Sequence, residues 1–162
     1  MKPKASRPYM PGYGIQGPKE GSGLLPWSWA VERLTSSHDY WVATVRDDGQ
    51  PNVMPVWGAW LDDTLWFSSS PGSRRARNLS RDPRCTVTTD NALEPVVLEG
   101  TAELVTDRPA VEAFTDACNA KYETDYTVEF FGDNALLRVT PTVVLALDSA
   151  DFIGSPTRWQ FS

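Results

Sequence analysis

The stretch WGAWLDDTLWFSSSPGSRRARNL, residues 57–79, decides the fold predicted for this chain. Residues 64–68 have the composition of a β-strand and run into a turn that contains three consecutive serines. An arginine-rich helix start follows, with Ser73 as a suitable N-cap. The stretch therefore predicts a strand, a hydroxyl-rich turn and a helix N-terminus in direct succession.

This corner is also the place where a bound anion is expected. The unpaired N–H groups and the dipole of a helix N-terminus stabilise a nearby anion. The turn residues Ser68–Ser70 offer hydroxyl donors, and Arg74 and Arg75 offer charge-assisted hydrogen bonds to a cofactor phosphate. The alternative is a solvated basic helix face, since arginine recurs at positions 74, 77 and 81. The pattern by itself leaves both interpretations open.

Size, charge and cysteine content narrow the classes of function. A chain of 162 residues suits one domain, and its net charge of −6 argues against a nucleic-acid partner. The N-terminus has no signal-type apolar segment, and no run of about 18 apolar residues occurs, so we expect a cytoplasmic protein without membrane association. Cys85 and Cys118 lack metal-ligand spacing, which predicts buried free thiols and no metal site.

The chain divides into an arm and a domain. Residues 1–23 are rich in Pro, Gly and Lys and lack apolar periodicity, which predicts a flexible N-terminal arm ahead of a compact domain at 24–162. Within that domain we predict helices at 25–34, from Ser73 to the stop at Asp82-Pro83, and at 108–122. We predict strands at 40–46, 51–60, 64–68, 84–89, 96–106, 136–139 and 143–147, with Pro141 separating the last two.

Six or seven short strands with inserted helices favour a mainly β fold, a closed antiparallel barrel, over a parallel βαβ sheet. The interior of a barrel this small is filled by its own side chains. A ligand must then lie outside the barrel or at an interface, which predicts a homodimer.

Several motifs occur in an order that resembles a known family. They are QPNVMPVWG at 50–58, LWFS at 65–68, SRRARNL at 73–79, DPR at 82–84 and EGTA at 99–102. From about residue 24 onward the chain resembles the pyridoxamine 5′-phosphate oxidase-like split β-barrel flavoproteins, and more narrowly their flavin and deazaflavin (coenzyme F420) oxidoreductase branch. The resemblance implies an FMN-binding split barrel of six or seven antiparallel strands and a homodimer with two cofactor sites at the subunit interface.

The resemblance also assigns site residues. In that family the ring lies along the second strand, here Met54–Trp57, and the phosphate lies where the serines meet Ser73, Arg74 and Arg75. The usual helix motif has Lys in place of Arg75, so the charge is kept while reach and geometry change. Trp159 belongs to a C-terminal segment that resembles the branch's Arg-Trp segment, and it either packs beside the cofactor or anchors the dimer interface. The predicted cofactor site is Met54, Pro55, Val56, Trp57, Ser68, Ser69, Ser70, Ser73, Arg74, Arg75 and Trp159.

No catalytic constellation is visible in the sequence. His38, the only histidine, is expected to be a capping or surface residue, and Asp62-Asp63 are expected to form a turn. Lys121-Tyr122 ends a helix, where the lysine either binds a ligand carboxylate or is a plain helix-end cation. The absence of an acid–base set suits redox chemistry, because hydride transfer is performed by the cofactor.

The leading hypothesis is therefore an oxidoreductase that moves a hydride between FMN or F420 and a small planar substrate, with Trp57, Trp60 and Trp159 as stacking surfaces. F420 is preferred because the branch resemblance points to it, and Arg77, Arg81 or Lys121 are candidate partners for its anionic tail. One alternative is a non-catalytic carrier or sensor for a flavin, F420 or a tetrapyrrole-sized ligand. Another is a cofactor-free structural dimer whose arginines face solvent.

Overall fold

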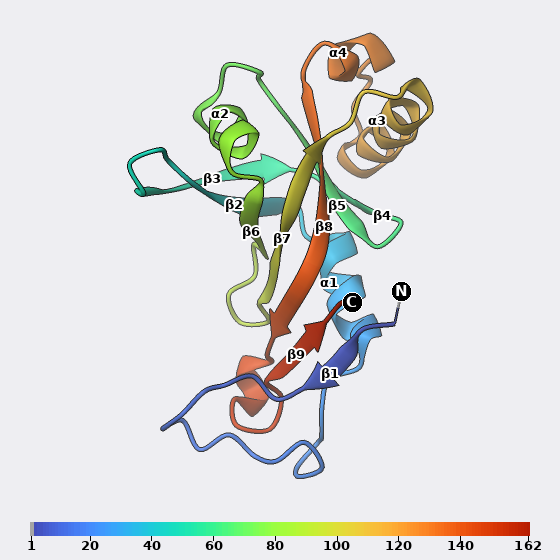
Figure 1. Ribbon diagram of the computed structural model, residues 1–162. Coiled ribbons are helices and arrows are strands. Elements are labelled where there is room, and N and C mark those ends of the chain that lie inside the picture. Colours follow the sequence, from blue (N-terminus) through green and yellow to red (C-terminus); the bar gives the residue numbers. More distant parts are fainter. Residues whose placement is uncertain (1) are drawn as a thin grey trace.

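The protein is built around a sheet of antiparallel β-strands. The computed structural model describes residues 2–162 and shows within them one sheet of nine strands and four α-helices (Figure 1). The strands are β1 (Lys4–Ser6), β2 (Asp39–Val45), β3 (Pro51–Trp57), β4 (Ala59–Leu61), β5 (Thr64–Ser69), β6 (Arg84–Thr89), β7 (Val96–Leu104), β8 (Ala135–Ala146) and β9 (Thr157–Gln160). The helices are α1 (Trp27–Ser36), α2 (Arg74–Arg81), α3 (Arg108–Tyr122) and α4 (Val128–Gly132), with a short 3₁₀ helix at Ser149–Asp151. The predicted fold class, mainly β with inserted helices, is confirmed.

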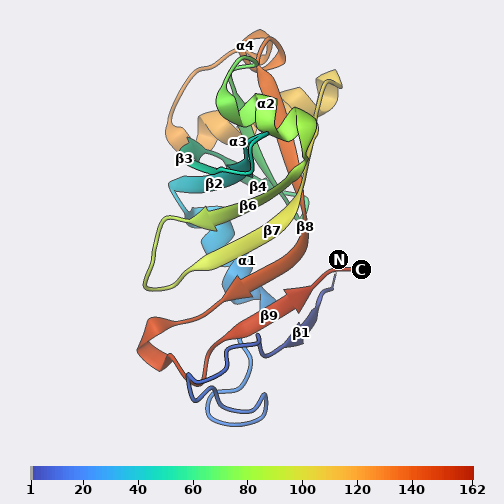
Figure 2. The same ribbon diagram turned by 60° about the vertical axis from the view of Figure 1, so that its left-hand side comes forward.

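The sheet branches at β8. Its strand order is β1-β9-β8-β7-β6-β2-β3, while β5 pairs with β8 and β4 pairs with β5. The first part of β8, residues 135–139, pairs with β5, and its last part, residues 143–146, pairs with β9. Strand β7 runs along the other edge of β8 (Figure 2). The long strand thereby holds two smaller groups of strands together.

The predicted closure of the barrel is wrong in one respect, because a seam stays open between β3 and β5. Among residues 2–162, β3 pairs with β2 alone, so the hydrogen-bonded ladder ends there. Gly58 is the one residue between β3 and β4, and an added Cβ there would lie 2.8 Å from the Trp66 carbonyl oxygen and 3.1 Å from the Tyr40 ring. This close approach brings β3 and β5 together by packing and leaves one edge of β3 unpaired.

Pro141 does not separate two strands, which corrects the prediction of strands at 136–139 and 143–147. Strand β8 is continuous from Ala135 to Ala146, and its register with β7 shifts between Glu99 and Gly100. Gly100 lies opposite Pro141 and Glu99 lies opposite Val143, so Thr142 is the extra residue of a bulge. A bulge tolerates a proline, which has no N–H to donate to a ladder.

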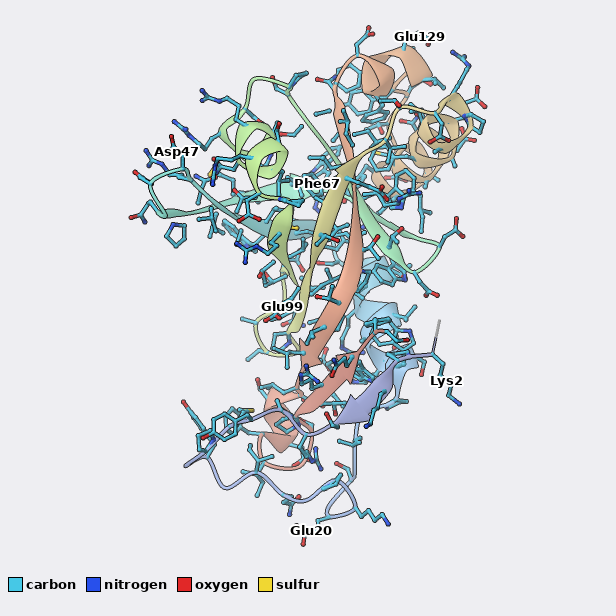
Figure 3. The ribbon with its side chains drawn as sticks, in the orientation of Figure 1. Lys2, Glu20, Asp47, Phe67, Glu99 and Glu129 are labelled. Atoms are coloured by element: carbon cyan, nitrogen blue, oxygen red, sulfur yellow. The ribbon has the colours of Figure 1, made fainter. Side chains whose placement is uncertain are left out.

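Two hydrophobic cores position the helices. The larger core lies inside the curled sheet, where Phe67, Val87 and Leu98 are fully buried and α1 packs against them. Figure 3 shows Phe67 in the upper half of the molecule, and Phe67 pairs with Leu137 of β8. The smaller core contains Trp66, Phe114 and Phe131 and fixes α3 and α4 against the other side of β5 and β8. Helices α2, α3 and α4 therefore gather at one end of the sheet, opposite β1 and β9 (Figures 1 and 2).

The two ends of the chain meet at the other end of the molecule. Lys4–Ser6 pairs with Arg158–Gln160, so the segment expected to lack regular structure contains a strand. The Arg7 guanidinium continues this attachment by donating to the Pro156 and Gly17 carbonyl oxygens at 2.8 Å and 3.1 Å. The flexibility of the rest of residues 7–23 stays a prediction.

Local turn and cysteine predictions are confirmed. Asp62 and Asp63 form the turn between β4 and β5, and both have positive φ angles of 49° and 57°, as a two-residue hairpin turn requires. Cys85 and Cys118 are free and buried. Within residues 2–162, every helix is too short or too polar to cross a lipid bilayer.

Candidate functional site

The corner between β5 and α2 gathers hydroxyl groups at a helix N-terminus. Ser73 is the N-cap of α2, and its Oγ accepts a hydrogen bond from the Ala76 N–H at 3.1 Å. The Ser69 Oγ lies 2.8 Å from the Ser73 Oγ, and the Ser73 N–H donates to the Ser70 carbonyl oxygen at 3.0 Å. The positive end of the helix dipole and the hydroxyl groups thus meet at one point.

Arg75 extends over this corner without a counter-charge. One terminal nitrogen of its guanidinium donates to the Ser69 Oγ at 2.8 Å, and the group lies 5.8 Å from the centre of the Phe67 ring. Its Nε is buried and has no hydrogen-bond partner, and burial lowers the pKa of the guanidinium. No carboxylate in residues 2–162 forms an ion pair with Arg75. A half-buried cation without an ion pair, beside serine hydroxyls, suits an anionic ligand.

A cavity of about 460 Å³ opens from this corner. This size falls in the range of small-molecule sites. It lies at the open seam of the sheet, with β3 on one side, β5 and α2 on another, and α3 and α4 on the third. The lining residues are Pro55, Val56, Trp57, Ser68, Ser69, Ser70, Ser73, Arg75, Phe114, Cys118, Tyr126, Phe130, Phe131 and Asn134. Eight of the eleven residues predicted for the cofactor site are therefore brought together in one cavity.

Three predicted residues lie elsewhere. Met54 is on β3 and 54% exposed, and Arg74 is exposed on α2, and neither lines the cavity. Trp159 is 1% exposed and packs in the main core, with its ring 5.4 Å from that of Trp27. Its placement beside a cofactor or at a dimer interface is thus corrected, because its neighbours within the chain already cover it. A core tryptophan and a binding tryptophan have the same local sequence signal, so the sequence does not distinguish them.

An aromatic stack supports the β3 side of the cavity. The Trp57 indole lies 4.2 Å from the Tyr122 ring at an angle of 6°, and the His38 ring meets both rings edge-on. The Tyr122 hydroxyl oxygen accepts from the Gly58 N–H at 2.9 Å, and the hydroxyl donates to the His38 carbonyl oxygen at 2.6 Å. His38 itself is exposed and lies outside the cavity lining. Helix α3 thereby fixes the orientation of Trp57.

Lys121 is half-buried in the same corner and does not line the cavity. Its Nζ donates to the Tyr40 Oη at 2.8 Å and to the Gly58 carbonyl oxygen at 2.9 Å. Desolvation lowers the pKa of Lys121 to about 8 and raises that of Tyr122 to about 12. Lys121 is therefore neither an exposed helix-end cation nor a lining residue. Its two hydrogen bonds join Tyr40 of β2 to the Gly58 backbone between β3 and β4.

The cavity wall contributed by α3 and α4 was not predicted. The sequence pattern at 108–122 predicts only a helix with an apolar face, and the sequence analysis predicts no helix or strand at 123–135. One signal was present, because Thr127 is an N-cap residue type followed by the aromatic pair Phe130-Phe131 in a polar stretch. That signal marks a short helix, and it does not show that the helix covers a cavity.

The family assignment follows from a match to residues 30–148, nearly three quarters of the chain, by the family described as "Pyridoxamine 5'-phosphate oxidase". The chain belongs to this family. No curated protein matches the chain.

Several solved structures have a fold similar to that of this chain. The conserved hypothetical protein Rv2991 from Mycobacterium tuberculosis is 24% identical, with a TM-score of 0.70 over 77% of this chain and 86% of that one. A protein described as an F420 reductase is 25% identical, with a TM-score of 0.59 over 74% of this chain and 98% of that one. An FAD-binding protein from Mesorhizobium loti is 21% identical, with a TM-score of 0.61 over 85% and 96%. Two of these proteins of similar fold are thus described by the cofactor F420 or FAD.

Proposed function

We propose that this protein is an oxidoreductase that transfers a hydride between F420 or FMN and a small planar substrate. The proposal rests on the Arg75 guanidinium, which is half-buried and forms no ion pair within residues 2–162. It lies at the N-terminus of α2, at the end of a cavity of about 460 Å³. Arg75, Ser69 and Ser73 fit a phosphate group, because they offer a cation, hydroxyl donors and the positive end of a helix dipole.

The rest of the cavity fits a planar ring. Pro55, Val56 and Trp57 supply an apolar wall, and the unpaired edge of β3 supplies backbone polar groups that can recognise the polar rim of a flavin-type ring. The Tyr122 stack holds the Trp57 indole in place before any ligand arrives. A wall that is already ordered binds without the entropy cost of ordering it.

F420 is the preferred cofactor in this proposal. The similarity to a protein described as an F420 reductase supports it, and Arg74 and Arg77 lie on the helix that carries Arg75. Both can attract the anionic tail of F420. Lys121, another candidate for the tail, already donates to Tyr40 and Gly58.

Hydride transfer is the chemistry that the cofactor supplies when it is bound, while the protein binds, orients and excludes water. We assign no residue as a general acid or base. His38 is exposed and pairs with Asp39 at 2.9 Å, outside the lining. The proton that accompanies the hydride then comes from solvent or from the substrate.

The proposed site is completed by a second copy of the chain. Trp41, Val45 and Val53 are exposed on the outer face of β2 and β3, and Pro55 pairs with Trp41 on that face while it lines the cavity. A partner packed on this face would cover the open side of the ring. We therefore propose a homodimer with two cofactor sites.

Titration of the apoprotein with FMN and with F420 tests the proposal. Arg75→Ala should weaken cofactor binding by about 1.5–3 kcal/mol, the range for a lost charged hydrogen bond. Arg81→Ala is the matched control, because Arg81 lies at the other end of α2 and donates to the Val45 carbonyl oxygen. Equal losses of cofactor affinity for the two variants would show that the phosphate does not bind at the N-terminus of α2.

Single-turnover oxidation of the reduced cofactor by an enone or a quinone tests the reaction itself. An oxidoreductase exchanges the hydride while the cofactor stays bound. Tight cofactor binding without any turnover would assign the protein to the class of carriers or sensors instead.

A further inference from the structure

The α3–α4 side of the cavity presents a pair of stacked aromatic rings. Tyr126 and Phe130 both line the cavity, and their ring centres lie 4.7 Å apart at an angle of 22°. They are nevertheless 38% and 46% exposed. Phe131, buried behind them, contacts both rings at 5.4 Å and 5.2 Å. The result is an exposed, flat apolar surface on a packed aromatic base.

This surface is held rigidly. The Asn119 side-chain amide donates to the Tyr126 carbonyl oxygen at 2.9 Å and accepts from the Tyr126 N–H at the same distance. Glu123 ends α3 in the left-handed conformation, and the Thr127 hydroxyl caps α4 by accepting from the Phe130 N–H. Both aromatic residues are thus anchored through their backbone. A preorganised aromatic surface gives up little entropy when a ring stacks on it.

The charged residues of the 125–133 segment are all acidic. Asp125, Glu129 and Asp133 are charged residues of this segment, and each lies next in sequence to a lining residue of the cavity. Glu129 pairs with Arg108 at 3.6 Å and points outward from α4 (Figure 3). Asp125 and Asp133 form no ion pair within residues 2–162. Arg75 therefore lines the α2 end of the cavity, whereas the segment that forms the α4 end carries carboxylates just outside the lining.

We propose that the Tyr126–Phe130 surface binds the substrate, and that this substrate is an aromatic ring system that is uncharged or positively charged. The inference rests on the proposed function, because it assigns the Arg75 end to the cofactor and the α4 end to its reaction partner. Stacking supplies the affinity, and Asp125 and Asp133 reject rings that carry a carboxylate or sulfonate. Like charges brought close together cost affinity, and salt screens that cost.

A matched series of ligands tests the charge selection: naphthylmethanol, naphthylmethylammonium and naphthoate, each titrated by calorimetry into protein loaded with oxidised FMN or F420. Naphthoate should bind on the order of tenfold more weakly than naphthylmethanol, a difference of about 1.4 kcal/mol. The Asp125→Asn, Asp133→Asn double variant should reduce that difference to about threefold, as should high salt. Asp47→Asn, on the distant β2–β3 hairpin, should leave it unchanged (Figure 3). Equal binding of naphthoate and naphthylmethanol to the wild type would overturn the proposal.

Phe130→Ala tests the stacking surface. It should weaken naphthylmethanol on the order of tenfold, the effect of losing one stacked aromatic ring, while the far-UV circular dichroism spectrum stays that of the wild type and so reports a folded protein. Phe152→Ala is the control, because Phe152 is 40% exposed and lies outside this cavity. An unchanged Phe130→Ala variant would overturn the proposal.

The failure of this inference can be distinguished from failure of the proposed function. If neither FMN nor F420 binds, the proposed function is wrong, and the three ligands are then titrated into the Arg75→Ala apoprotein, which lacks the competing anion site. Binding that is lost when Phe130→Ala is added would still support the aromatic surface, and binding that is not lost would overturn it.

Discussion

Arg75 and Lys121 are both half-buried cations, and their partners determine different roles. Arg75 has a serine hydroxyl, an unpaired Nε and no carboxylate in the described chain, so it still has capacity for an anion. Lys121 uses its donors on the Tyr40 hydroxyl and the Gly58 carbonyl oxygen. Arg75 is therefore available to the ligand in the proposed function, whereas Lys121 joins Tyr40 to the backbone that follows Trp57.

The buried state of Lys121 predicts an unusual dependence of stability on pH. Its pKa falls from 10.5 in the unfolded chain to about 8 in the folded protein, so between these values only the unfolded chain holds the proton. Lys121 should therefore make the free energy of unfolding rise with pH above pH 8, by at most about 1.4 kcal/mol per pH unit. From about pH 9 upward the trend should level off and then reverse, because burial raises the pKa of the Cys85 thiol from 9.0 to about 12 and also raises that of Cys118, and the pKa of Tyr122 rises from 10.0 to about 12. In this range the unfolded chain loses protons that the folded protein keeps.

Urea unfolding over this pH range, on the wild type and on Lys121→Met, measures the effect. The variant shares every other titrating group, so the rise above pH 8 should disappear in it while the fall at higher pH, which the thiols and Tyr122 cause, remains. A rise as steep in the variant as in the wild type would show that Lys121 stays charged in the folded protein.

Local chemistry explains which site residues could be predicted. Ser73, Ser69 and Arg75 lie within seven positions of each other, so cap preference and charge were enough to bring them together. The contact of Lys121 with Tyr40 spans 81 positions, and the burial of Trp159 depends on α1 and the sheet interior. No periodic pattern records contacts of that kind, because they form only when distant segments of the chain pack together.

The same difference between local signals and long-range contacts explains which helices and strands could be predicted. Helix α3 begins and ends where predicted, at Arg108 and Tyr122, because Asp107 caps it and Pro109 occupies its first turn. Strand β8 was divided at Pro141, since a proline normally ends a strand. Its continuity depends on a bulge opposite β7, and the β1–β9 pair depends on residues at opposite ends of the chain. Pairings of this type have no signal in either segment alone.

The bulge in β8 gives an element-scale prediction. Gly100 of β7 leaves no room for a side chain, because an added Cβ would lie 2.4 Å from the Thr140 carbonyl oxygen and 3.0 Å from Val139 Cγ1. Gly100→Ala should therefore lower the free energy of unfolding by about 1–3 kcal/mol, the usual cost of overpacking. Gly132→Ala is the control, because an added Cβ there meets nothing within 4 Å. The urea midpoints of the two variants should differ, and equal midpoints would mean that the bulge relaxes to accept the methyl group.

At the scale of the whole molecule, the fold leaves the cavity beside an apolar sheet face. The seam between β3 and β5 exposes the cavity, and the adjoining outer face of β2 and β3 exposes Trp41, Val45 and Val53. Exposed apolar side chains grouped beside a cavity are typical of a protein–protein interface. One association could then bury the apolar face and close the site together.

The last prediction is that dimerisation and cofactor binding fail together. Val53 is 49% exposed and pairs with Ala43 in the middle of this face, so Val53→Lys would place an unpaired charge in the proposed interface. The wild type should sediment as a dimer at micromolar concentration, through an interface of more than about 1,000 Å². Val53→Lys should sediment as a monomer and bind FMN or F420 more weakly, on the order of tenfold or more. Leu93→Lys, at a loop residue that is 70% exposed, should change neither property. A monomer that retains wild-type cofactor affinity would show that one chain builds the whole site and that the partner is not needed to cover the ring.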